Sequence, residues 1–535
     1  MSYPAALDAL KQRAEAGRSQ RFSESFPRLA LDEKQQLIST YHPDFVQGRM
    51  RPLVVGPSPG LRMPVELADV IEGRSRLDPA HLPEVEPDLE VDVLVIGGGG
   101  AGTAAALTAH EHGARVLMAT KLRHGDANTM MAQGGIQAAD KAVDSPAIHY
   151  LDAMGGGGFT NIPDLLEALV RDGPEIIHWL EGLGCMFDKE PDGTMRTMHL
   201  GGSSRKRIHT AKDYTGMEIM RTLRDEFRSH PDLTVLEHAP AIELLGDGQG
   251  GCAGAVLQNL ETGDCLIVQS RCTIMATGGS GRLHYQEFPT TNHYGATGDG
   301  LAMAYRLGAE LVFLDSMQYH PTGAVFPEQI VGQLVTEKLR GMGAQLVNVD
   351  GEQFIHQLEA RDTVASAIIR ECRARKRGIA TPAGQQGVWL DTPMVDIIHG
   401  PGSILAHFAA MYRQFHRFGI DIREEPVLVY PTFHYQNGGL VIDAQGHTTV
   451  HRLFSAGEVS GGVHGRNRLG GNSLLEVLVY GRRAGRTAAQ EAGNVQRGRP
   501  SLAHLAAFET ACRDAGLDGR VVSPVLLPDY TGPRP

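Results

Sequence analysis

Cysteine is scarce in this sequence, and no two cysteines form a C-x-x-C pair. The 535 residues include six, at positions 185, 252, 265, 272, 372 and 512. Structural zinc sites and iron–sulfur clusters are usually built from closely spaced cysteines. The sequence therefore predicts no metal site within this chain, and we expect reduced, mostly buried thiols of the kind found in cytoplasmic proteins.

Long hydrophobic runs are also missing. No uncharged apolar stretch approaches the ~18 residues of a membrane span. The first twenty residues, MSYPAALDALKQRAEAGRSQ, contain neither an apolar signal core nor a twin-arginine start. We expect a cytoplasmic protein, peripheral on the inner face of a membrane only where a partner subunit holds it there.

Positive charge is not in excess. The chain has 50 Lys and Arg against 62 Asp and Glu, a formal charge of −12, and no basic tail. A phosphate-backbone partner requires clustered basic groups. We therefore expect no nucleic-acid partner.

Glycine, in contrast, is abundant and clustered. The chain has 65 glycines, concentrated at 97–102, 155–158, 278–281, 438–439 and 457–471. Glycine clusters are typical of backbone that turns sharply or approaches a ligand closely. These clusters favour a nucleotide-type cofactor. Because the chain exceeds the ~250 to 300 residues at which a single core stops growing, we also expect two or more domains.

Residues 91–120 predict a strand, a glycine turn, a helix and a second strand. Gly97, Gly99 and Gly102 form a G-x-G-x-x-G pattern between the first strand and the helix. There it lets a pyrophosphate reach the helix N-terminus. A purely structural turn is the alternative. The acidic residue expected after the second strand is replaced by Thr120 and Lys121, which disfavours a simple NAD dehydrogenase.

Two later segments return to the same pattern. Residues 271–283 predict a strand that ends in a glycine turn, and 451–485 predict another strand followed by a helix from about Asn472. Such spacing indicates a nucleotide-binding domain, 90–313 and 436–494, interrupted by a second domain, 314–435. Residues 1–89, with helices near 4–17 and 31–41, form an arm that either packs over the main body or docks another subunit. Residues 495–535 form a short tail.

Ten motifs along residues 90–490 occur in the order typical of one flavoprotein family. They are GGGGAG (97–102), NTMMAQGGI (128–136), DYTG (213–216), ATGG (276–279), TGDG (297–300), QYHPTG (318–323), TEKLRG (336–341), ARD (360–362), HYQNGG (434–439) and GEVSGGVHGRNRLGGNSL (457–474). The sequence thus resembles the flavoprotein subunit of the fumarate reductase and succinate dehydrogenase family, which includes L-aspartate oxidase. The resemblance implies an α/β fold, with a Rossmann-like FAD-binding domain and an α+β capping domain over a small dicarboxylate.

The resemblance also assigns the substrate chemistry. Arg361 matches the arginine that delivers a proton, and Glu337 and Arg340 match the pair that recharges it from solvent. The residues implied for binding fumarate or succinate are His320, Thr336, His434 and Arg468. From the residues alone, Glu337 and Arg340 could instead be an exposed i,i+3 helix pair. Each histidine could equally be structural, and Arg361 with Asp362 could cap a helix.

For FAD, the resemblance and its motifs imply thirteen residues: Gly97, Gly99, Gly102, Asn128, Thr129, Gly134, Gly135, Thr277, Gly278, Asp299, Glu458, Ser473 and Leu474. Asn128 stands where many members of the family carry the histidine that bonds FAD covalently. We therefore expect noncovalent FAD, a departure that favours fumarate reduction over succinate oxidation.

The resemblance leaves three functions open. The favoured one is a fumarate–succinate oxidoreductase, the flavoprotein subunit of a complex with an iron–sulfur partner. L-aspartate oxidase shares several of the motifs. The third is an electron-transfer subunit without dicarboxylate chemistry. The electron donor, the direction of the reaction and the oligomeric state do not follow from the residues.

Overall fold

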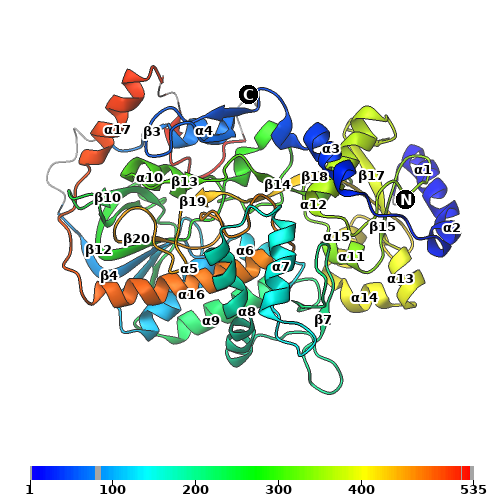
Figure 1. Ribbon diagram of the computed structural model, residues 1–535, viewed down its shortest axis with the longest axis horizontal. Helices are drawn as coiled ribbons and strands as arrows, with labels where there is room; N and C mark the ends of the chain where they lie inside the picture. The colour runs from blue at the N-terminus through cyan, green and yellow to red at the C-terminus, as the bar shows by residue number, and fades with distance from the viewer. Residues whose placement is uncertain (1–2, 79–85, 518, 520, 531–535) are drawn as a thin grey trace.

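The computed structural model describes residues 3–78, 86–517, 519 and 521–530. One end of the elongated molecule holds a mostly parallel sheet, and the other holds a smaller antiparallel sheet with short helices (Figure 1). This is a mixed α/β fold, as the sequence predicts.

The first sheet has seven strands in the order β10-β11-β12-β4-β5-β9, with β20 beside β12. β12 runs parallel to both β4 and β20, whereas β10 and β11 form an antiparallel extension. The strand bounds are β4 Leu89–Ile96, β5 Val116–Ala119, β9 Thr234–Leu236, β10 Ala241–Gly246, β11 Cys252–Gln258, β12 Cys265–Met275 and β20 Leu453–Ser455. The predicted strands at 91, 271 and 451 are therefore neighbours in one sheet.

Two small-residue helices cover one face of this sheet. α5 spans Gly100–Glu111 and packs closely against α16, Asn472–Ala492, which begins at the predicted residue. A Cβ at Gly485 would lie 2.3 Å from the carbonyl oxygen of Ala105. Only glycine permits so close a helix contact. The contact places the start of α16 near the glycine turn that precedes α5.

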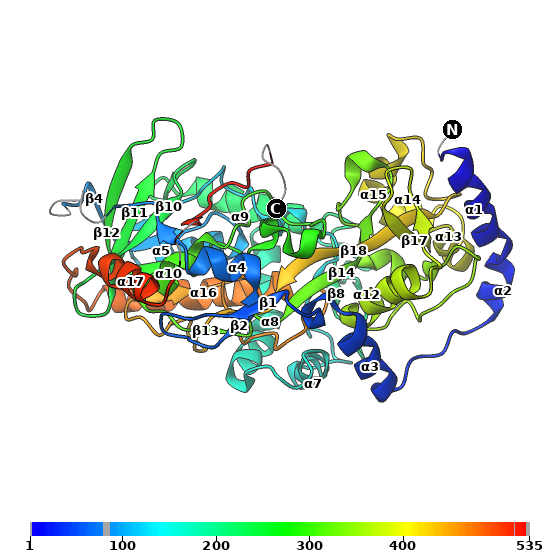
Figure 2. The same cartoon turned by 90° about the horizontal axis from the view of Figure 1, so that it is seen from above.

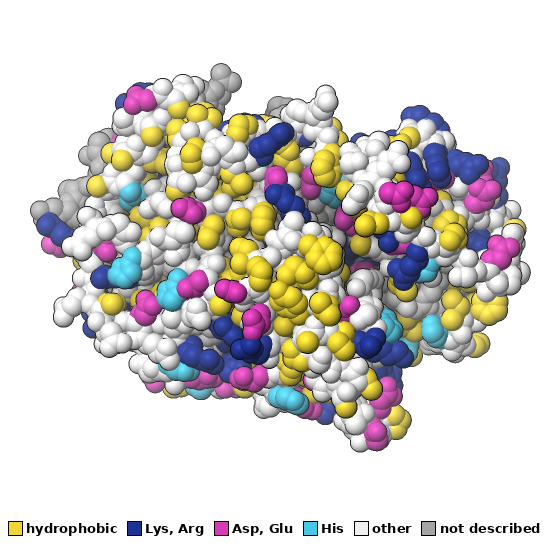
Figure 3. Space-filling view, in the orientation of Figure 1, with side chains coloured by type: hydrophobic (Ala, Val, Ile, Leu, Met, Phe, Trp, Pro, Cys, Tyr) yellow, Lys and Arg dark blue, Asp and Glu magenta, His cyan; other side chains and the backbone are white. Residues whose placement is uncertain are grey.

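Further helices surround the sheet. They are α6 Asn128–Met131, α7 Pro146–Gly156, α8 Pro163–Gly182, α9 Thr215–Ser229 and α10 Asp299–Leu307. Short strands add a three-stranded ladder, β6 Ile136–Gln137, β7 Thr197–Met198 and β8 Ile208–His209, and the pair β13 Leu311–Val312 and β19 Gly439–Leu440. Figure 3 shows hydrophobic side chains gathered around α7, where Leu151 is 68% and Phe159, just after the helix, 80% exposed.

The second sheet lies within the predicted capping segment. Its antiparallel order is β14-β18-β17-β15, with β16 paired to β17. The strands are β14 Met317–Ala324, β15 Gln345–Val347, β16 Ile379–Ala380, β17 Gln386–Asp391 and β18 Val427–Gln436. The helices are α11 Glu337–Gly341, α12 Arg361–Ile369, α13 Met394–His399, α14 Ser403–His407 and α15 Ala409–His416. The domain boundaries themselves stay a prediction.

The N-terminal segment packs over both bodies (Figure 2). α1 Ala5–Ala16, α2 Arg18–Ser23 and α3 Leu31–Tyr41 lie on the second body. There Arg21 donates to Asp391 at 2.5 Å. The chain then reaches the first body through β1 Met50–Pro52, β2 Arg62–Pro64 and α4 Val65–Ile71. Both predicted helices are confirmed, and the described part of the segment packs on the main body, while docking of another subunit stays a prediction.

The C-terminal residues return to the first body. After α17, Ala503–Asp514, the strand β21 Val522–Ser523 pairs in parallel with β3 Arg74–Ser75. None of the helices in the described part of the chain is long and apolar enough to span a bilayer. All six cysteines are free, and five are buried, Cys265 being the exposed one.

Candidate functional site

A deep pocket opens where the glycine turn after β4 meets the N-termini of α5 and α16. Gly97 has φ +118°, and a Cβ there would lie 2.2 Å from the carbonyl oxygen of Ala276. Gly99 is the N-cap of α5, so the N–H groups of the first turn lie at the pocket, where the N–H of Gly100 donates to Thr129 Oγ1 at 3.2 Å. Thr277 Oγ1 is buried without a hydrogen-bond partner among the described residues. A glycine cradle with unpaired donors fits a pyrophosphate.

Most of the predicted cofactor residues lie around this pocket. Those that line it are Gly97, Gly99, Asn128, Thr129, Thr277, Gly278, Asp299, Glu458, Ser473 and Leu474. Gly102, Gly134 and Gly135 do not. A Cβ at Gly102 would lie 1.8 Å from the Gly97 carbonyl oxygen, so this glycine permits the tight turn. Gly135, with φ +106°, faces Ile208 and likewise serves the backbone.

Lys121 follows β5 where an acidic residue is expected, and it pairs with a carboxylate. Its ammonium donates to Asp299 Oδ2 at 2.5 Å and to the Gly295 carbonyl at 2.8 Å. Both Lys121 and Asp299 line the pocket. The carboxylate therefore comes from α10, far along the chain, which sequence reasoning did not connect with Lys121.

Asn128 lies at the pocket with both ends of its amide engaged. Its nitrogen donates to Glu458 Oε2 at 3.1 Å and Asn292 Oδ1 at 3.2 Å, and its oxygen accepts from the His293 N–H at 2.5 Å. Burial raises the pKa of Glu458 to about 7. An amide cannot form the covalent flavin bond that the resemblance assigns to a histidine at this position in many members.

The nearest preceding histidine, His124, does not replace it. His124 is buried and contacts Thr103 Oγ1 at 3.0 Å rather than lining the pocket. Burial, followed by the charge of Arg228, lowers its pKa to about 4.

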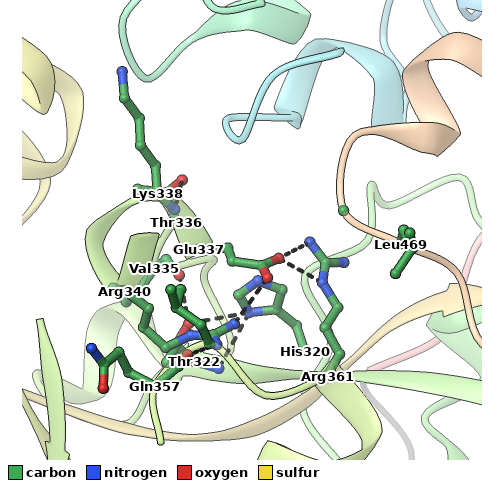
Figure 4. Close-up of polar contacts among 12 residues, drawn as sticks. His320, Thr322, Val335, Thr336, Glu337, Lys338, Arg340, Gln357, Arg361 and Leu469 are labelled. Carbon is green, nitrogen blue, oxygen red and sulfur yellow. Dashed lines mark hydrogen bonds and ion pairs between the residues drawn. The ribbon is translucent and has the colours of Figure 1, made fainter. Parts of the chain in front are cut away.

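Arg361, Glu337 and Arg340 form a buried chain of alternating charge (Figure 4). Arg361 donates to Glu337 Oε2 from Nε at 2.7 Å and from a terminal nitrogen at 2.5 Å. The other Glu337 oxygen lies 3.5 Å from Arg340, which donates to the Gln357 carbonyl at 2.7 Å. The exposed-pair alternative is wrong, because Glu337 is 3% and Arg340 0% exposed.

Local structure explains this placement. Thr336 is the N-cap of α11, and its hydroxyl accepts from the Lys338 N–H at 3.4 Å, so Glu337 and Arg340 lie one turn apart. Arg361 is the first residue of α12. Burial alone would raise the pKa of Glu337, but the charges of Arg361 and Arg340 outweigh it and lower the pKa. Glu337 is therefore an anion between two cations.

Gln318 joins this chain to Arg468. Its amide oxygen accepts from Arg361 at 3.0 Å and from Arg468 at 2.9 Å. Arg468 also donates to Ser473 Oγ at 3.1 Å and lies 4.4 Å above the Tyr435 ring. Because Ser473 lines the pocket, the arginines meet the cofactor pocket here. Burial, followed by repulsion from Arg361, lowers the pKa of Arg468 to about 9.

The two predicted histidines lie together beside these arginines. Their ring centroids are 5.0 Å apart, and His434 lines the pocket while contacting Thr291 Oγ1 at 2.7 Å. His320 Nδ1 accepts from the Thr322 N–H at 3.2 Å. Burial, followed by the charge of Arg361, lowers the pKa of both well below the ordinary value. Both are therefore neutral near pH 7.

The structure thus brings the four predicted substrate-binding residues and the three predicted proton-transfer residues together in one region. Gln318 lies in the QYHPTG motif, but the local sequence does not predict its role, because Arg468 lies 150 positions away. A pattern of nearby residues does not predict such a contact. The arrangement offers cations and neutral imidazoles for a small dianion, next to a pocket that fits a dinucleotide.

The comparisons with known proteins agree with this geometry. Residues 92–474 match the FAD binding domain family. One subunit of the fumarate reductase (CoM/CoB) of Methanothermobacter marburgensis is 39% identical over 419 residues, covering 76% of this chain and 74% of that protein. L-aspartate oxidase of Streptomyces coelicolor is 37% identical over 465 residues, covering 84% and 74%.

A solved structure is similar as well. The FrdA chain of Escherichia coli quinol fumarate reductase has a TM-score of 0.72 and 30% identity, covering 80% of this chain and 75% of that one.

Proposed function

The chain belongs to the FAD-binding flavoprotein family of fumarate reductases, succinate dehydrogenases and L-aspartate oxidases, and we propose that within it this protein interconverts fumarate and succinate. It is an FAD-dependent oxidoreductase. The observation that carries the proposal is the buried Arg361–Glu337–Arg340 chain beside Arg468 at the end of the cofactor pocket.

Reduction of a C=C bond between two carboxylates requires a hydride, a proton and cations to hold the carboxylates. The glycine cradle, the Lys121–Asp299 pair and Ser473 would hold FAD, which in its reduced form would supply the hydride. Arg468 is suited to a bidentate grip on one carboxylate. His320, His434 and the Thr336 hydroxyl offer hydrogen bonds to the substrate without adding charge.

Arg361 is the proton donor in this proposal. A guanidinium is a weak acid, but the carbanion-like carbon formed after hydride addition is a far stronger base. The transfer is therefore favourable. Glu337 is an anion, so it must first take up a proton that arrives from solvent by way of Arg340. It can then pass a proton to the deprotonated guanidine of Arg361, from which it accepts at 2.7 Å. Arg340 extends the chain from the other Glu337 oxygen.

Burial of three charges is tolerable because each has a partner. Glu337 lies between Arg361 and Arg340, and Gln318 accepts from both Arg361 and Arg468. An unpaired buried charge would cost several kcal/mol or more. Arg361, Glu337 and Arg340 together carry one net positive charge, and Arg468 adds a second. This positive charge favours binding of a dianion.

We further propose that FAD is noncovalent and that the favoured direction is fumarate reduction. Asn128 supports both, because its amide occupies the position of the bonding histidine and is hydrogen-bonded to Glu458. The sequence has no C-x-x-C pair, so electrons would come from an iron–sulfur partner or a diffusible reductant. The relative in Methanothermobacter marburgensis is named as one subunit of its enzyme, which supports a partner. Any membrane contact would be made by that partner.

L-aspartate oxidase is the second candidate, because the relative of that name is 37% identical over 84% of this chain. Purified protein should be assayed anaerobically with reduced methyl viologen and fumarate, and aerobically with L-aspartate. We expect viologen oxidation that requires fumarate, with one succinate formed for every two molecules of reduced viologen oxidised. Robust formation of iminoaspartate and hydrogen peroxide from L-aspartate would contradict the proposal.

A further inference from the structure

Part of the N-terminal segment contacts two stretches of chain that adjoin the arginine cluster, one at Glu359 and one at Met317. Residues 28–46, here called the strap, comprise α3 and the residues that flank it. The family match begins at residue 92, so it assigns this stretch no role. The strap packs on α12, the helix that begins with Arg361.

The first polar contact is at Glu359, two residues before Arg361. Lys34 Nζ lies 2.8 Å from Glu359 Oε2, and the Leu29 N–H donates to Glu359 Oε1 at 3.1 Å. Arg28 lies 4.0 Å from the same carboxylate. Glu359 is 2% exposed, so the strap supplies the cations that compensate a buried charge.

Arg340 holds the opposite side of this short segment. It donates to the Gln357 carbonyl at 2.7 Å, while the strap holds Glu359. The chain from Gln357 to Arg361 is therefore fixed between the proton relay and the strap. Leu37 of the strap belongs to the same hydrophobic cluster as Val364 of α12, which fixes the helix as well.

The second polar contact is at the start of β14. The Met317 N–H donates to Asp44 Oδ2 at 3.0 Å, and Asp44 follows α3 directly in the short 3-10 turn Pro43–Phe45. Met317 precedes Gln318, the residue that accepts from both Arg361 and Arg468. The strap thus contacts the chain within two residues of both Arg361 and Gln318.

We propose that the strap positions Arg361 and Gln318 for proton transfer, with Lys34 and Asp44 as its positioning residues. A proton donor displaced by 1 Å from its productive position can lose about 100-fold in rate. The inference rests on the proposed function, since it assigns a purpose to the placement of Arg361. It goes beyond that function by making the N-terminal segment part of the active site's support.

The test uses three variants of the full chain loaded with FAD. They are the single variants Lys34→Met and Lys34→Arg, and a double variant that carries both Arg28→Met and Lys34→Met. The matched control is Lys11→Met. Lys11 lies in the N-terminal segment but outside the strap, and it makes a 2.8 Å ion pair with Glu425. In fumarate reduction by reduced methyl viologen we expect kcat about 10-fold lower in the double variant, with KM within about two-fold. Lys34→Arg should restore kcat, and Lys11→Met should leave it unchanged.

Amide hydrogen exchange provides a second measurement that needs no activity. Exchange of residues 357–366 should accelerate in Lys34→Met and in the double variant, but not in Lys11→Met. Unchanged kcat and unchanged exchange in the double variant would overturn the inference. If the wild type reduces no fumarate while exchange still accelerates only in the strap variants, the proposed function fails but the support of Arg361 by the strap stands.

Discussion

Arg361 and Arg468 donate to the same atom, the amide oxygen of Gln318, at 3.0 and 2.9 Å. A neutral oxygen holds two guanidinium groups in place without cancelling their charge. The pair can therefore still attract a dianion, and Gln318 fixes the geometry in which it does so.

Replacing Gln318 with glutamate tests this arrangement. A carboxylate between the two guanidinium groups would neutralise them and repel the substrate carboxylates, so KM for fumarate should rise about 10-fold or more. Gln385→Glu, on an exposed turn, is the control that adds the same charge elsewhere. An unchanged KM in Gln318→Glu would show that the shared oxygen does not face the substrate.

Glu337→Gln should interrupt the supply of protons to Arg361. The amide cannot carry a proton as the carboxylate does, and it leaves two buried arginines without their anion. General acid–base steps are typically worth 10²- to 10⁴-fold, and we expect kcat for fumarate reduction to fall by about that range. Glu328→Gln, at an exposed position, should not change kcat. Equal rates in the two variants would contradict the relay.

The βαβ unit, the glycine cradle and the start of α16 at Asn472 follow from local patterns, because strand hydrophobicity and glycine turns are determined within a few residues. The Gln318–Arg468 contact, the Lys121–Asp299 pair and the Lys34–Glu359 pair do not. Each joins segments more than 100 positions apart, and only the packed tertiary structure brings them together.

Flavin release tests the interpretation of Asn128. After acid precipitation of purified protein, we expect the yellow flavin in the supernatant and none attached to the pellet, since no imidazole lies at this position to form the bond. The absorbance of the supernatant near 450 nm should account for the bound FAD. Flavin fluorescence that remains with the denatured chain would contradict noncovalent binding.

His149 should make stability depend on pH. It contacts Asn472 Oδ1 at 2.9 Å, and burial, followed by the charge of Arg207, lowers its pKa to about 4. An unfolded histidine has a pKa near 6.5, so below pH 6.5 the unfolded chain takes up the proton first. His149 alone then lowers the free energy of unfolding by about 1.4 kcal/mol per pH unit as the pH falls toward about 4, in addition to the effects of other buried groups.

His149→Gln keeps a side-chain donor toward Asn472 but cannot titrate. The midpoint of thermal unfolding should therefore fall less steeply between pH 6.5 and 4 in this variant than in the wild type. His451→Gln, on an exposed histidine, should keep the wild-type slope. Identical slopes for all three proteins would show that His149 binds protons equally in both states.

The most direct test of the central claim is a single turnover of Arg361→Lys, with the FAD reduced beforehand and fumarate then added. We predict full FAD content and reoxidation by fumarate about 10² to 10⁴ times slower than in the wild type, because a lysine cannot hold both Glu337 and Gln318 while reaching the substrate carbon. Reoxidation at the wild-type rate would contradict Arg361 as the proton donor and favour an electron-transfer subunit without dicarboxylate chemistry.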